Sequence, residues 1–217
     1  KALNLGYPTD VECSVAKIYE KMWSANYYPE GPPAASLVTL HFEQNEKTNS
    51  NVEMVWMDGG IIPPRPEIIP ADDYLGEKGN TNGVLIVGDD GVITCGVYGL
   101  NPKLYQKGKR TLHLDTDAIY HKNNSLDHLH HKEWIDAIKG GYGSDEYKKL
   151  TAPIEYSGPF TEIVLMGNLA LRSYMLKDGD DFIGRKKLLW DGVNTKITNF
   201  DAANQFVGRV RREGWAL

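Results

Sequence analysis

Short strand-like segments joined by hairpin turns leave this chain few possible architectures. Leu37–Glu43 alternates apolar and polar side chains, and Val52–Met57 follows it after a polar stretch. Gly83–Gly88 and Val92–Cys95 are separated only by Asp89-Asp90-Gly91, a strong hairpin signal. Strands joined in this way run antiparallel, which argues against the alternating βαβ pattern of a parallel sheet.

The predicted helices gather in the C-terminal part of the chain. Ser125–Lys139 has helical character and stops at Gly140-Gly141. Ser157-Gly158-Pro159 opens the strongest helix, whose apolar stripe runs from Phe160 to Tyr174, and Asp201–Glu213 is predicted to be the last helix. The chain is therefore predicted to be an α+β protein, with a large, mostly antiparallel β-sheet and helices packed on one face.

The remaining segments are less regular. Val11–Lys21 is predicted to be the first strand, Trp23–Ala35 a loop and Lys187–Trp190 a short strand. Asp58–Gly79 is long and irregular, and a loop of that length in a compact domain is usually functional or disordered. Lys103–Ile119 is ambiguous, and we interpret it as one more short strand and a loop.

Both faces of the Val52–Met57 strand are apolar, which indicates that both are covered. One cover is expected to be the domain's own helices. The other is expected to be a second subunit or another domain.

Composition excludes several classes of protein. The formal net charge is −5, and no basic cluster of the kind that nucleic acid requires is present. No apolar stretch approaches the ~20 residues of a membrane span. Cys13 and Cys95 are too few for a disulfide framework, and each falls in a strand-like run typical of a buried small side chain.

The first residues resemble the end of a helix rather than the start of a protein. Lys1 to Leu5 are followed by Gly6, a residue that commonly terminates helices. We therefore expect the chain to be part of a longer protein, so that a missing targeting signal carries no information.

The chain contains no sequence motif for nucleotide or catalytic chemistry. It has no G-x-G-x-x-G cradle for a dinucleotide, no P-loop, no H-E-x-x-H and no G-x-S-x-G elbow. The chain itself is expected to bind no cofactor and no metal, and no residue is assigned a catalytic role.

The first candidate ligand-binding residues lie after the Val52–Met57 strand. Asp58 precedes two glycines, and Arg65 lies within Pro63-Pro64-Arg65-Pro66. Prolines stiffen the loop and can aim Arg65 at an anionic or hydroxyl-rich ligand. The alternative is a rigid loop that covers a sheet edge.

The second candidates are His130, His131 and Glu133, at the start of a predicted helix. His128 and His131 share one helical face, which raises the possibility of zinc. The alternative, which we favour, is an ordinary helix start, with Trp134, Ile135 and Ile138 packing the helix down.

A set of short motifs in a fixed order resembles a known family. The segments are Trp56-Met57-Asp58-Gly59-Gly60, Pro63-Pro64-Arg65-Pro66, Asn82–Asp89, His130–Ile135, Tyr156–Glu162, Leu189-Trp190-Asp191-Gly192, Ala203-Asn204-Gln205 and Gly214-Trp215. In this order and spacing the chain resembles, from Leu5 to Leu217, the C-terminal domain of the bacterial-type Gfo/Idh/MocA oxidoreductases.

The resemblance implies a parent enzyme with two domains. Residues 1–217 would be a single C-terminal domain whose sheet walls the substrate site and often forms a homo-oligomer interface. An N-terminal Rossmann domain, which would bind NAD or NADP, is absent from the chain, as are the family's Glu-Lys-Pro motif and its catalytic histidine. The substrates implied are sugars or polyols, and by itself the chain is expected to be inactive.

The resemblance leaves several alternatives open. Some relatives use bound nicotinamide in a glycoside-hydrolase cycle, and a non-enzymatic carbohydrate-binding or assembly module is a third possibility. Many relatives carry export signals, so a periplasmic parent is expected, with a cytoplasmic one left open.

Overall fold

The computed structural model describes residues 2–22, 24–26, 31–79, 82–116, 126–208 and 211–215. Within these residues the chain is a mixed α+β protein whose paired strands are all antiparallel, as predicted. The strands do not form one large sheet but a five-stranded sheet, a four-stranded sheet and two small hairpins. The chain divides into two compact units, one of Lys1–Ile61 with Ile154–Leu217 and the other of Ile62–Pro153.

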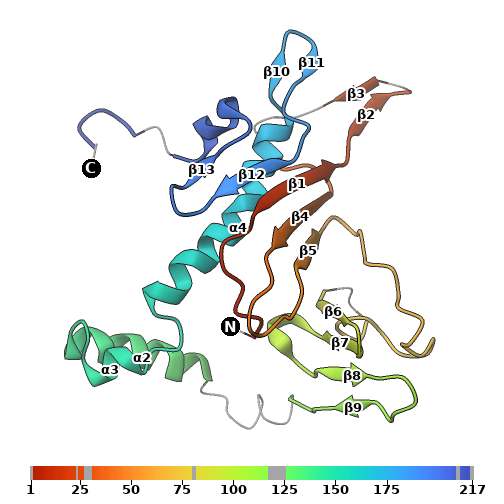
Figure 1. Cartoon of the computed structure of the whole chain (residues 1–217), viewed down its shortest axis with the longest axis vertical. Coiled ribbons are helices and arrows are strands. Elements are labelled where there is room, and N and C mark those ends of the chain that lie inside the picture. Colours follow the sequence, from red (N-terminus) through yellow and green to blue (C-terminus); the bar gives the residue numbers. More distant parts are fainter. Residues whose placement is uncertain are drawn as a thin grey trace. The chain divides into compact units, whose positions relative to one another are not determined.

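The first unit is built on the five-stranded sheet (Figure 1). Its strands are, in spatial order, β13 (Lys196–Ile197), β12 (Leu188–Asp191), β1 (Asp10–Val15), β4 (Ser36–Phe42) and β5 (Val52–Met57). The predicted hairpin of β4 and β5 is confirmed, with Leu40 opposite Met54.

One face of this sheet forms the core of the first unit. The alternation of β4 is strict, because every second side chain is buried. Helix α4 (Ile154–Tyr174) packs on this face through Met166, Leu169, Ala170 and Ser173, which follow helical spacing (Figure 1). The buried hydrophobic residues of this core are Val11, Val38, Leu40, Phe42, Met166, Leu169, Ala170, Leu188, Trp190, Ile197 and Ala203.

The predicted start of α4 is wrong. The helix begins at Ile154, so that Pro159 is its sixth residue instead of part of its first turn. A proline there has no N–H to donate to the carbonyl four residues earlier, at Glu155. The predicted stripe is also displaced, because Phe160 and Val164 are 52% and 59% exposed.

The predicted first strand is two strands. β1 pairs with β4 as far as Val15 and Ser36, and β2 (Ile18–Lys21) pairs instead with β3 (Ser24–Asn26), inside the predicted loop. Pro32 and Pro33 lie just before β4, and prolines cannot donate the hydrogen bonds of a longer ladder. The partner of β1 therefore ends where the break occurs.

The predicted last helix is also wrong. Asp201–Phe206 forms only a short 3₁₀-helix, η2, and residues 211–215 are not helical. The Asn204 side chain accepts from the Ile197 amide at 2.8 Å and donates to the Ile197 carbonyl at 3.0 Å, which ties η2 to β13. The small hairpin of β10 (Lys177–Asp178) and β11 (Asp181–Phe182) was not predicted, although Asp178-Gly179 is a turn signal.

The second unit contains the four-stranded sheet. Its strands are, in spatial order, β6 (Val84–Gly88), β7 (Gly91–Cys95), β8 (Lys103–Tyr105) and β9 (Leu112–His113), with the short 3₁₀-helix η1 (Val97–Gly99) between β7 and β8. The β6–β7 hairpin is as predicted. The ambiguous segment contributes two strands, and its residues 117–119 lie outside the described residues.

Two helices complete the second unit. α2 (Leu126–Gly140) ends where the sequence predicts, with Gly141 in the left-handed region at φ 85°. The short α3 (Asp145–Lys148), which was not predicted, is capped by Ser144, whose side chain accepts from the Tyr147 amide. The prediction that Trp134, Ile135 and Ile138 pack α2 down is wrong, because they are 62%, 46% and 63% exposed.

Candidate functional site

Asp58 joins the end of β5 to the start of β4. Its carboxylate accepts from the Ser36 amide at 2.5 Å, the Ser36 hydroxyl at 2.8 Å and the Trp56 indole N–H at 3.2 Å. The chain turns at once afterwards, with Gly59 at φ 63°, and a side chain there would meet the Ala34 carbonyl at 2.2 Å. The structure thus gives Asp58 and Gly59 a role in closing this corner of the sheet.

Arg65 also bonds within its own unit. Its guanidinium donates to the Pro70 carbonyl at 3.0 Å and to the Asp73 carbonyl at 2.8 Å. These two bonds fold the 62–79 segment back on itself, because they span five and eight residues. The geometry therefore resembles the rigid-loop alternative, and a ligand-binding role for Arg65 stays a prediction.

Asp73 then anchors this loop to the four-stranded sheet. Its two carboxylate oxygens contact Lys103 Nζ at 2.5 Å and Tyr105 Oη at 2.6 Å. Burial alone would raise the pKa of Asp73, but the hydrogen bonds from Lys103 and Tyr105 lower it overall. Burial and the neighbouring Asp73 raise the pKa of Tyr105 to about 12. Sequence reasoning missed this cluster, since no local pattern links Asp73 to residues thirty positions away.

His130, His131 and Glu133 lie on α2. Glu133 accepts from the Thr151 amide at 3.2 Å and the Thr151 hydroxyl at 2.9 Å, and His130 Nδ1 lies 3.2 Å from the same hydroxyl. His131 is exposed, with its ring 6.3 Å from that of His130. The structure therefore brings together His130 and Glu133, through Thr151, which the sequence did not single out. The side chain of His128 lies outside the described residues.

An ionic cluster that the sequence did not predict lies on the first unit's sheet, on the face opposite α4. His41 Nδ1 lies 2.6 Å from Asp10 Oδ1, and His41 Nε2 lies 3.5 Å from Glu53 Oε2. Lys187 Nζ lies 3.6 Å from Asp10 and 3.4 Å from Glu12. Desolvation alone would lower the pKa of Lys187, but the charge of Asp10 and the hydrogen bond to Glu12 raise it overall. The only sequence signal was the alternation of Leu37–Glu43, which places His41 on the face opposite Leu40 and Phe42. Its partners come from other segments of the chain.

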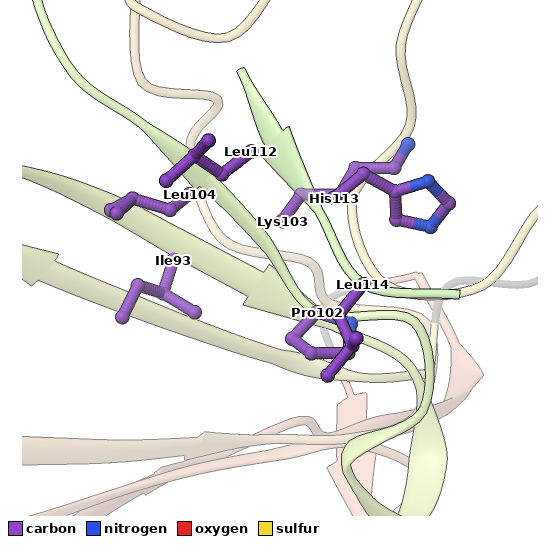
Figure 2. Close-up of a pocket in the computed structure, with 7 residues that line it drawn as sticks. All are labelled: Ile93, Pro102, Lys103, Leu104, Leu112, His113 and Leu114. Atoms are coloured by element: carbon purple, nitrogen blue, oxygen red, sulfur yellow. The ribbon is translucent and has the colours of Figure 1, made fainter. Parts of the chain in front are cut away.

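A shallow hollow of about 260 Å³ lies on the four-stranded sheet (Figure 2). It is lined by Ile93, Pro102, Lys103, Leu104, Leu112, His113 and Leu114. Leu112 and Leu114 are 61% and 57% exposed, so the hollow is largely an uncovered apolar surface. Few polar groups converge on it, unlike a typical small-molecule site.

The described residues include neither a cluster of metal ligands nor a membrane-spanning helix. Among them, no three His, Cys, Asp or Glu side chains are grouped so that they could hold a metal ion. No helix in the same part of the chain is long and apolar enough to cross a bilayer.

Comparison with known proteins assigns the chain to no family. No protein-family model matches the chain, and no curated protein matches it. A substrate-binding role for Asp58, Arg65, His130, His131 and Glu133 therefore stays a prediction.

Proposed function

We propose that this chain is the substrate-side and oligomerisation domain of an NAD(P)-dependent oxidoreductase of the Gfo/Idh/MocA type, acting on sugars or polyols. The observation that carries the proposal is the sheet of the first unit. One face is packed by α4, and the other keeps ionic and apolar side chains partly exposed, including Glu53 and Leu189. A sheet with one covered face and one partly exposed apolar face is typical of a domain that packs against a second domain or subunit.

The ordered motifs support the same proposal. Asp58-Gly59 closes the β4–β5 corner, and the Arg65 loop is held in a defined shape on the second unit. Both motifs therefore have a defined structural role in this chain. The nucleotide and the hydride-transferring groups would come from a Rossmann domain, because the chain itself has no glycine-rich cradle.

The substrate would lie near the start of α2 in this proposal. His130 and His131 are exposed there, and Glu133 and Thr151 hold His130 in place. Imidazole and hydroxyl groups are suitable partners for the hydroxyls of a sugar or polyol. Arg65 and Asp58 would contribute by shaping their loops.

The test is an assay of the protein encoded by the complete gene. We expect it to transfer hydride between a sugar or polyol and NAD or NADP, measured by nicotinamide absorbance over a substrate panel. The 217-residue chain assayed in parallel should bind no nicotinamide in calorimetry. Tight nucleotide binding by this chain would contradict the proposal, and cleavage of nitrophenyl glycosides by the complete protein would favour the glycoside-hydrolase alternative.

A further inference from the structure

Three exposed side chains of helix α2, here called the α2 patch, lie on one side of the helix. His131 follows His130, and Trp134 lies three residues after His131 and four after His130. Side chains three and four residues apart on a helix are neighbours, so the indole lies beside both imidazoles. Trp134 is 62% exposed, and both histidines are exposed as well. The α2 patch therefore presents two imidazole rings and one larger, mainly apolar ring.

Thr151 connects His130 of this patch to a carboxylate. The Thr151 hydroxyl lies 2.9 Å from Glu133 Oε2 and 3.2 Å from His130 Nδ1, and the Thr151 amide donates to the same Glu133 oxygen at 3.2 Å. Thr151 is 18 positions from Glu133 and 21 from His130 in the chain, so the fold is what brings the three groups together. They form a continuous line of hydrogen bonds from the carboxylate to the imidazole.

The number of protons in this line fixes the tautomer of His130. A hydroxyl has one proton to donate, and an ionised carboxylate can only accept. The Thr151 hydroxyl therefore donates to Glu133, which leaves the hydroxyl oxygen as the acceptor for His130 Nδ1. Nδ1 must then carry the proton, and in a neutral imidazole Nε2 is left with a lone pair.

His130 thus offers a hydrogen-bond acceptor at an exposed position. Such an atom selects for a donor, such as the hydroxyl of a sugar, and against a carboxylate, which only accepts. Charged side chains nearby on the helix are already engaged, since Glu133 accepts from Thr151 and Lys132 pairs with Asp136. These contacts favour a neutral ligand over an anionic one.

Trp134 suits the same class of ligand. The C–H groups of a sugar ring form an apolar face, and an exposed indole offers a flat apolar surface with a polar N–H at its edge. Sites for small molecules commonly combine apolar contact with a few well-placed polar groups. The α2 patch supplies both within about one turn of the helix.

We propose that the α2 patch binds a neutral sugar ring, with His130 Nε2 accepting from a ligand hydroxyl and Trp134 packing against the ring. Thr151 and Glu133 are positioning residues, because they set the tautomer of His130 without touching the ligand. The inference rests on the proposed function, which places the substrate near the start of α2. It adds the atoms that make the contact and the preference for an uncharged ligand.

NMR spectroscopy of the 217-residue chain with isotope-labelled histidine tests the tautomer. At about pH 8, where histidine side chains are normally neutral, we expect His130 to be protonated at Nδ1. Thr151→Val removes the hydroxyl, so His130 should shift towards protonation at Nε2, the form that a free histidine side chain favours in water. Thr151→Ser keeps the hydroxyl and should keep the tautomer.

Titration of the same chain with glucose and galactose tests the ligand. Both sugars should shift the signals of His130 Nε2 and the Trp134 indole, whereas gluconate, an anion, should bind more weakly. Thr151→Val and, separately, Trp134→Ala should raise the dissociation constant of the sugars about fivefold or more. Thr151→Ser should bind them as the wild type does.

Thr161→Val is the matched control. It removes a hydroxyl that is also exposed but that donates to the Ser157 carbonyl within α4, so it should change neither the tautomer nor the binding. Trp134→Ala should weaken binding and leave the tautomer of His130 unchanged, which separates the apolar contact from the line of hydrogen bonds. Circular dichroism checks that each variant is folded.

Several results would overturn the inference. They are protonation of wild-type His130 at Nε2, a tautomer that Thr151→Val leaves unchanged, sugars that shift neither signal, and tighter binding of gluconate than of the sugars. Failure of the proposed function is a different result, because it is measured as hydride transfer by the complete protein. Sugar binding by this chain, together with a complete protein that transfers no hydride, would support the α2 patch and remove the dehydrogenase activity.

Discussion

At the scale of single residues, Asp58 and Arg65 show how a side chain suited to ligands can instead form hydrogen bonds within its own chain. Both were singled out because a charged group follows a strand or stands in a stiff loop. In the structure their hydrogen-bonding groups contact Ser36, Trp56, Pro70 and Asp73. Such bonds stabilise the fold whether or not the residues also meet a substrate.

Replacing Asp58 by alanine should destabilise the chain. The change removes three hydrogen bonds, two of them to Ser36, which is buried, and we expect the free energy of unfolding to fall by about 2 kcal/mol. Urea unfolding measures it, with the exposed Asp72→Ala as the matched control. Equal stability of the two variants would show that the corner does not depend on Asp58.

The ionisation of Tyr105 should lower the free energy of unfolding at alkaline pH. An ordinary tyrosine has a pKa of 10.0, and that of Tyr105 in the folded chain is about 12. The contribution of Tyr105 to the free energy of unfolding is therefore fully present below about pH 10. It is lost as the pH rises towards 12, because the tyrosine hydroxyl loses its proton at a lower pH in the unfolded chain than in the folded one. Urea unfolding of Tyr105→Phe at several pH values should show a shallower alkaline decline than the wild type. Tyr98→Phe, at a site 91% exposed, should decline as the wild type does.

At the scale of elements, α4 and the first strand were predicted in the right place but with the wrong ends. Periodicity identifies a helix from Phe160 onwards, because that signal depends on residues within a few turns. The helix extends back to Ile154, beyond a proline that local rules treat as a first-turn residue. The break between β1 and β2 similarly depends on where the partner strand begins.

Pro159→Ala should stabilise α4 if the helix begins at Ile154. Alanine supplies the N–H that proline lacks, and the free energy of unfolding should rise by about 1 kcal/mol or more. Thermal or urea unfolding measures the change, with Pro153→Ala, just outside the helix, as the comparison. A neutral or destabilising result for Pro159→Ala would place the start of the helix at Pro159.

At the scale of the whole molecule, the two units have separate and unequal cores. The main cluster of buried hydrophobic residues has eleven members in the described part of the first unit. In the described part of the second unit it has three, Ile69, Val92 and Tyr105. A small core stabilises its unit less, because hydrophobic stabilisation grows with buried area. The second unit relies correspondingly on the polar contacts of Asp73 with Lys103 and Tyr105.

Hydrogen exchange should reveal this inequality. Local stability varies along a chain with the density of buried contacts, so amides of β7 should exchange about tenfold faster or more than those of β4. Mass spectrometry of peptides covering Gly91–Cys95 and Ser36–Phe42 measures both in one sample. Equal protection of the two strands would show that the smaller core is not the weaker one.

The α+β class, the β4–β5 and β6–β7 hairpins and the end of α2 at Gly140 followed from the sequence alone. Each depends on turn chemistry or on alternation over a few neighbouring residues, and such signals act locally. Tertiary structure decided the division into two units, the start of α4 and the partners of Asp58, Arg65 and Asp73. Those features depend on contacts between residues far apart in the chain, and so does the ionic cluster of Asp10, His41, Glu53 and Lys187, which four separate segments assemble on one face.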